Sequence, residues 1–107
     1  MAQESARPVI LAVDDDSDLL ALIAKVLATA YEVKTAGDGG DALALAAAAP
    51  QPDLILLDIE LPGASGFEVC QAVRGDESLA GVKILMLSAK GRDTDLAKGS
   101  ALGADAY

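Results

Sequence analysis

Short apolar runs separate longer stretches of helical spacing along this chain. The runs are bounded by Pro, Gly or acidic residues, as strands typically are, and they cover 8–13, 31–36, 54–57 and 82–88. The run 31–36 alternates large and polar residues, which indicates an edge strand with one exposed face. The run 54–57 is continuously apolar, as in a strand buried on both faces, yet it ends at the charged residue Asp58.

The stretches between these runs predict helices from their apolar spacing and their end signals. Ser17 and Asp18 supply N-cap chemistry for a first helix, whose apolar stripe extends over 19–27. Asp41 is expected to cap a second helix that continues to Ala49, where nearby prolines terminate it.

The second half of the chain continues the same alternation. The loop 63–66 precedes a helix with apolar residues at every third position, which Gly75 ends, and a polar loop follows over 76–81. A weak helix is expected from residue 93 or 94 to near 103, and 104–107 begins a fifth strand.

Strands that alternate with helices imply an α/β fold, with a parallel sheet covered on both faces by right-handed crossovers. Five strands in the common doubly wound order 2-1-3-4-5 give a flavodoxin-like fold, whose ligands bind where the strand order reverses, between strands 1 and 3. Acids 14–16 follow the first strand and Asp58 ends the third, so we expect them to share one crevice. Ser88 should arrive there from the neighbouring fourth strand.

Length and composition are those of one domain spanning 1–107, with 1–7 as a loose N-terminal segment. No apolar stretch approaches the roughly 18 residues needed to cross a bilayer, and no secretory signal is visible. The single cysteine, Cys70, cannot form an internal disulfide and is expected in the core on a helix, which favours a reducing cytoplasm.

The charge balance and the missing residue types exclude several function classes. A net charge of −9 with scattered basic residues and 3% aromatic residues argues against direct nucleic-acid binding. The chain has no histidine, which excludes imidazole bases, Ser/His triads and ordinary zinc sites. Carboxylates, hydroxyls, lysines and a hard metal ion remain as sources of chemistry.

Carboxylates that meet at one rim repel one another unless a cation joins them, and oxygen ligands of this kind suit Mg²⁺. An Asp carboxylate is also a phosphoryl acceptor, and the Ser88 hydroxyl would donate a hydrogen bond to a phosphoryl oxygen. Plainer interpretations exist for each feature: acids 16–18 as helix caps, Asp58 as a solvent boundary, and Ser88 as a turn residue. Because the acids after the first strand, Asp58 and Ser88 are all expected at one point of the fold, a functional site is favoured over three unrelated structural roles.

Four segments together carry a resemblance to a known family: ILAVDDDSDLL, PDLILLDIELPGASGFEVC, ILMLSAKG and LGADAY. In this order and spacing, the chain resembles the receiver domain of two-component response regulators from about Val9 to Tyr107. The resemblance implies a phosphorylation-dependent signalling module, which is not an enzyme beyond its own phosphoryl transfer and dephosphorylation.

The resemblance also implies a metal site and a phosphoacceptor. Asp58 would accept the phosphoryl group and ligate Mg²⁺, with Mn²⁺ as the alternative ion. Asp15 would bind the ion directly, Asp14 through water, and Glu60 through its backbone carbonyl.

The same resemblance implies a switch and its partners. Ser88 would be the switch hydroxyl, Ala89 the small neighbour that admits phosphate, and Tyr107 the aromatic that follows Ser88. A histidine kinase, a phosphotransfer protein or a small phosphodonor would supply the phosphoryl group. The surface around strands 4 and 5 would then bind an effector domain, an effector protein or a second copy, with no membrane partner.

The family pattern continues beyond the aromatic with a lysine that contacts the phosphoryl group and a last helix, whereas this sequence stops at Tyr107. Loss of that helix would expose an apolar patch that invites pairing with another chain. Lys90 has three interpretations: a solvated loop lysine, a phosphate ligand, or a partner of Glu60 that hinders the hydrolytic water.

Two rival functions remain open. A Mg²⁺-dependent phosphatase with an aspartyl-phosphate intermediate also begins from an Asp after an apolar strand, but it needs a second Asp where this chain has Glu60. A phosphorylation-independent interaction module would keep the fold. The acids Asp14, Asp15 and Asp58 speak against that module, and the absent lysine speaks for it.

Overall fold

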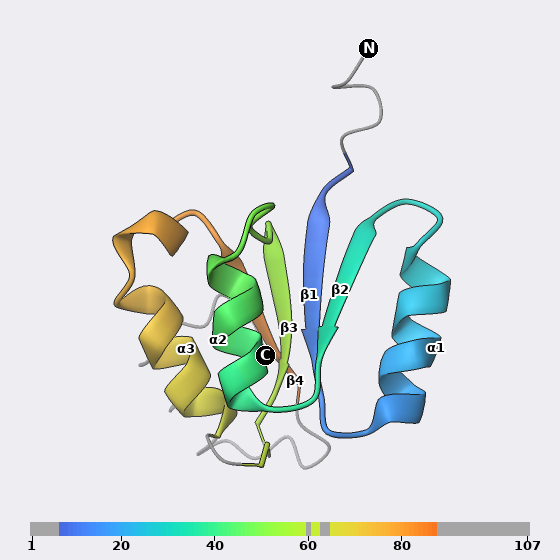
Figure 1. Ribbon diagram of the computed structural model, residues 1–107, viewed down its shortest axis with the longest axis horizontal. Helices are drawn as coiled ribbons and strands as arrows, with labels where there is room; N and C mark the ends of the chain where they lie inside the picture. The colour runs from blue at the N-terminus through green and yellow to red at the C-terminus, as the bar shows by residue number, and fades with distance from the viewer. Residues whose placement is uncertain (1–6, 60, 63–64, 88–107) are drawn as a thin grey trace.

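A parallel sheet forms the centre of the molecule, for which the computed structural model describes residues 7–59, 61–62 and 65–87. Within these residues the sheet has four strands in the order β2-β1-β3-β4 (Figure 1). Their bounds are β1 Val9–Val13, β2 Glu32–Ala36, β3 Leu54–Asp58 and β4 Lys83–Leu87. This order confirms the flavodoxin-like arrangement for these strands. The expected helix from residue 93 or 94 and the fifth strand lie outside the described residues.

Helices cover both faces of this sheet, as right-handed crossovers require. Their bounds are α1 Ser17–Leu27, α2 Gly39–Ala47 and α3 Gly66–Arg74, followed by a 3-10 turn, η2, at Glu77–Leu79. Figure 1 shows α1 on one face and α2 and α3 together on the other. No helix of the described ranges has the length and apolar character needed to span a membrane.

The helix starts differ from the sequence prediction by one to three residues. Asp16, not Ser17 or Asp18, caps α1, because its extended backbone lets the side chain accept from two free N–H groups. Asp38, not Asp41, caps α2 in the same way, accepting from the Asp41 N–H. The second helix also ends at Ala47 rather than Ala49.

Two further differences lie around the third helix. Gly66 is the first residue of α3 rather than part of the preceding loop, and Ser65 is its cap. The polar loop predicted at 76–81 contains the turn η2, capped by Asp76. The turn η2 is short and α3 begins at a glycine, so apolar spacing does not indicate where either element starts.

The core lies between the sheet and the pair α2 and α3. Ile55 and Leu57 of β3 are fully buried there, and Cys70 joins them from α3, as the sequence predicted. The opposite side chains of β3, including Leu56, are only half-buried, so the expected burial on both faces is not observed. Among the described elements, the helix on that face, α1, packs mainly on β1 and β2, and no described helix packs closely on β3 and β4 there.

An apolar groove of about 420 Å³ marks this uncovered face. Side chains of α1, β3 and β4 line it: Leu22, Ile23, Val26, Leu27, Leu56, Leu85 and Leu87. Leu22 and Val26 are 58% and 62% exposed along its rim. The described part of the chain therefore carries an unpartnered apolar surface beside α1.

Candidate functional site

The register of the sheet brings two acids to the same edge. The last residue of β1, Val13, pairs with Leu57 of β3, so the next residues, Asp14 and Asp58, stand at the carboxyl ends of adjacent parallel strands. The Asp14 N–H donates to the carbonyl of Ala36 in β2 at 3.1 Å, which fixes the backbone as it leaves the sheet. This placement is the one expected at the point where the strand order reverses.

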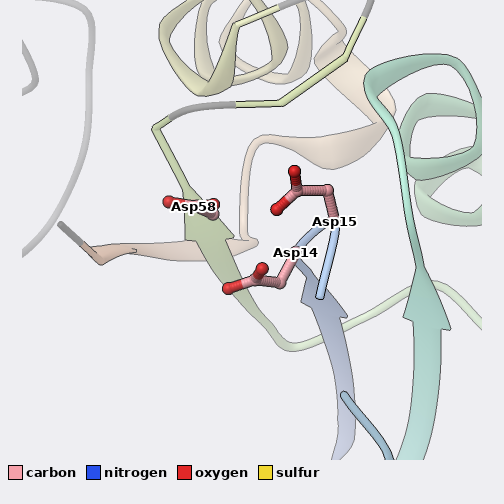
Figure 2. Close-up of side chains that lie close together, drawn as sticks. All are labelled: Asp14, Asp15 and Asp58. Atoms are coloured by element: carbon pink, nitrogen blue, oxygen red, sulfur yellow. The ribbon is translucent and has the colours of Figure 1, made fainter. Parts of the chain in front are cut away.

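Three carboxylates meet at this edge. Asp14, Asp15 and Asp58 each offer an oxygen, and these oxygens all lie within 4.8 Å of one another. Asp14 and Asp58 are half-buried, whereas Asp15 is exposed. Figure 2 shows the three side chains grouped around one space, Asp14 and Asp15 from the end of β1 and Asp58 from the end of β3.

Local hydrogen bonds distinguish Asp14, which belongs to the carboxylate cluster, from Asp16, which caps α1. An Asp14 carboxylate oxygen accepts from the Asp16 N–H at 2.9 Å, which holds the Asp14 side chain in place. The Asp16 carboxylate instead accepts from Asp18 and Leu19, at 3.0 and 3.1 Å, as the cap of α1. The capping interpretation therefore holds for Asp16, while Asp14 and Asp15 join Asp58.

The backbone of Asp58 is held by two neighbours. It pairs with Leu87 of β4, and the next N–H, from Ile59, donates to the Leu87 carbonyl at 3.3 Å. The Ile59 carbonyl accepts from the Gly66 N–H at 2.7 Å, which links the strand end to the start of α3. The carboxylate therefore extends from a backbone with partners in both the sheet and a helix.

The donor set of this cluster fits a hard divalent cation. All three groups are carboxylates, without the nitrogen or sulfur donors that zinc and copper favour. Their mutual repulsion at this spacing is relieved by a cation between them. Mg²⁺ and Mn²⁺ accept such oxygen ligands and keep water in the remaining positions.

The other predicted site residues fall outside the described ranges. These are Glu60, Ser88, Ala89, Lys90 and Tyr107. Sequence reasoning gave no role at the site to Gly66, which lies against the backbone of Asp58. The one available signal was the residue type, because a glycine directly before a predicted apolar helix allows another backbone to approach closely.

Comparison with known proteins gives a consistent family match. The family model of the response regulator receiver domain matches residues 10–107. The "DNA-binding dual master transcriptional regulator RpaA" of Synechocystis is 46% identical over 103 residues, covering 94% of this chain and 42% of that protein. The "DNA-binding response regulator MtrA" of Mycobacterium tuberculosis is 41% identical over 105 residues. This match covers 97% of the present chain and 44% of MtrA. The chain thus spans less than half the length of these relatives.

Solved structures share the fold. The chemotaxis protein CheY4 of Vibrio cholerae superposes with a TM-score of 0.88 at 35% identity, covering 94% of this chain and 84% of that one. The Mn²⁺-bound form of the response regulator Rcp1 superposes with a TM-score of 0.83 at 28% identity, covering 94% of this chain and 78% of that one. The α/β architecture and the strand order described above are those of CheY-like proteins.

Proposed function

This chain belongs to the response regulator receiver domain family, and from that premise we propose that it accepts a phosphoryl group on Asp58 and thereby switches a partner-binding surface. Receiver domains of response regulators are signalling modules rather than general catalysts. The observation that carries the proposal is the convergence of Asp14, Asp15 and Asp58 within 4.8 Å at the carboxyl edge of the sheet.

Asp58 supplies the nucleophile in this proposal. One of its carboxylate oxygens attacks the phosphorus of a phosphohistidine, the P–N bond breaks, and an acyl phosphate forms while the imidazole leaves. Asp15 and Asp58 would hold Mg²⁺ directly, Asp14 would hold it through water, and Glu60 through its carbonyl. When bound, the ion offsets the repulsion between the phosphoryl oxygens and the carboxylates. The name of the Mn²⁺-bound Rcp1 supports a divalent ion in this family.

The switch is proposed to follow from the new charge on Asp58. The Ser88 hydroxyl would donate to a phosphoryl oxygen beside the small Ala89, and Tyr107 would fill the space that Ser88 leaves. Such a local event biases a two-state surface around β4. If Lys90 paired with Glu60 across the site mouth, the pair would slow hydrolysis of the acyl phosphate. An exposed pair of this kind would itself contribute only about 0 to 1 kcal/mol.

The proposed partners are a histidine kinase or a phosphotransfer protein upstream, and an effector domain or protein downstream. The relatives RpaA and MtrA are named as DNA-binding and are more than twice as long as the matched region. In a longer chain, an effector of that kind would bind DNA while the receiver itself would make no direct nucleic-acid contacts. We propose the cytoplasm as its location and a second copy as one possible partner of the switched surface.

The test is Mg²⁺-dependent labelling with acetyl phosphate, followed on gels that retard phosphorylated proteins. We expect the wild type, but not Asp58→Asn, to form an alkali-labile phosphoprotein. Repeated turnover of phosphate esters would favour the phosphatase instead. A folded wild type that is never labelled, with Mg²⁺ present, would favour the phosphorylation-independent module.

A further inference from the structure

The first turn of α3 lies directly on the strand end that carries the acceptor. Gly66, the first helical residue, is buried, and its N–H donates to the Ile59 carbonyl at 2.7 Å. Its Cα faces the main chain of Asp58 and Ile59. The backbone of Asp58 is thus bounded by β4 on one side and by α3 on another.

Gly66 is required for this contact because of space, not because of its backbone angles. A Cβ at this position would overlap the Asp58 carbonyl oxygen and stand 2.8 Å from Ile59 Cα and 2.9 Å from the Asp58 carbonyl carbon. All three atoms belong to the backbone, so no flexible side chain can move aside. Its φ is not in the left-handed region, so an alanine would meet no conformational strain of its own.

The overlap would be relieved at the strand end rather than by the helix. Val69, Cys70 and Val73 anchor α3 in the core with exposures of 1%, 0% and 0%. Among the described strands only β4 pairs with the backbone at Asp58, because the β1 pairing of β3 stops at Leu57, one residue earlier. A methyl group at 66 would therefore displace the backbone from which the Asp58 carboxylate extends.

We infer that Gly66 is a positioning residue for the acceptor site: the contact of its bare Cα with the Asp58–Ile59 backbone sets where the Asp58 carboxylate stands relative to Asp14 and Asp15. This inference rests on the proposed function, since it concerns the cation and phosphoryl chemistry of the same site. Groups that orient metal ligands typically change metal affinity by about 10- to 100-fold when altered. A displacement on the order of 1 Å also lowers reaction rates strongly.

The chain offers matched glycine and capping controls. Gly66→Ala is compared with Gly81→Ala, where an added Cβ meets nothing within 4 Å. Ser65→Ala is the stability control, because it removes the cap that accepts from the Glu68 N–H but adds no atom beside Asp58. Mg²⁺ affinity is measured by titration calorimetry, alongside thermal unfolding and the rate of labelling by acetyl phosphate.

We expect Gly66→Ala to weaken Mg²⁺ binding by at least about 10-fold, and Gly81→Ala and Ser65→Ala to keep it within about 2-fold. If Gly66→Ala unfolds, the titration is repeated in trimethylamine N-oxide, which favours the folded state. Wild-type affinity in folded Gly66→Ala would overturn the inference, as would an equal loss in Ser65→Ala. A wild type that binds no Mg²⁺ would instead count against the proposed function.

A second readout uses the wild type alone. If the Gly66 contact and the cation site are coupled, Mg²⁺ must favour the state in which α3 lies on the Asp58–Ile59 backbone, by the reciprocity of linkage. The Gly66 N–H bonds to the Ile59 carbonyl in that state and reports on it. We expect saturating Mg²⁺ to slow hydrogen exchange of the Gly66 amide several-fold more than that of the Gly75 amide, which bonds to Gln71 at 3.0 Å at the other end of α3. Equal slowing of both amides would overturn the coupling.

Discussion

Removing one charge from the acidic cluster should stabilise the metal-free protein while weakening its response to Mg²⁺. Asp14→Asn is the cleanest perturbation, because an asparagine oxygen can still accept the hydrogen bond from the Asp16 N–H. The substitution removes repulsion with Asp15 and Asp58 and keeps the local geometry. Stability and metal binding should therefore change in opposite directions.

The magnitude follows from the spacing of the carboxylates. Two unit charges 4.8 Å apart repel by about 0.9 kcal/mol at the dielectric of water and by about 3.5 kcal/mol at an effective dielectric of 20. Asp14 is only half-buried and Asp15 is exposed, so the lower part of this range applies. Asp14 and Asp15 are adjacent in sequence and still repel when unfolded. We expect a net gain of about 1 to 2 kcal/mol in the free energy of unfolding.

The assay is urea unfolding with and without Mg²⁺, in low and high salt. Glu32→Gln, at an exposed position of β2, is the control that removes one negative charge elsewhere. Mg²⁺ at 100 times its dissociation constant should stabilise the wild type by about 2.7 kcal/mol, and Asp14→Asn by clearly less at the same concentration. High salt should shrink the metal-free gain. A gain no larger than that of Glu32→Gln would refute the reasoning.

Three further predictions concern the core, the cap and the metal. Leu57→Ala should lower the free energy of unfolding by about 2 to 5 kcal/mol, and Leu56→Ala by less, because Leu56 faces the open groove; equal losses in urea titrations would contradict the described core. Asp16→Ala should cost about 0.5 to 2 kcal/mol as a lost cap while retaining Mg²⁺ affinity, and Ser17→Ala should cost less; a loss of Mg²⁺ binding in Asp16→Ala would make Asp16 part of the metal site. Chelation by EDTA should abolish labelling by acetyl phosphate, and Mg²⁺ or Mn²⁺ should restore it; labelling that persists in EDTA would rule out a metal-dependent transfer.

The meeting of the acids was predicted from the alternation of strands and helices together with the common strand order of such sheets. Parallel strands that alternate with helices place all their carboxyl ends at one edge, and the common doubly wound order sets β1 beside β3, so acids that follow these two strands are expected to come together. That inference needs the positions of Asp14, Asp15 and Asp58 relative to apolar runs, together with that strand order. It does not need the exact bounds of any helix.

The cap assignments and the close approach of Gly66 were beyond the sequence for equally physical reasons. The run DDDSD offers several side chains able to cap α1, and only backbone conformation selects Asp16 among them. The half-exposure of Leu56 depends on where α1 packs across the sheet, which the pattern of β3 does not encode. Gly66 resembles any loop glycine until the helix is docked on the strand.

The most direct test of the central claim is the intact mass of the protein before and after incubation with acetyl phosphate and Mg²⁺, with Asp58→Asn as the control. We expect the wild type to gain one phosphoryl group, mapped by fragmentation to Asp58, and the variant to gain none. An unchanged wild-type mass, or equal gain by the variant, would contradict the assignment of Asp58 as the phosphoacceptor.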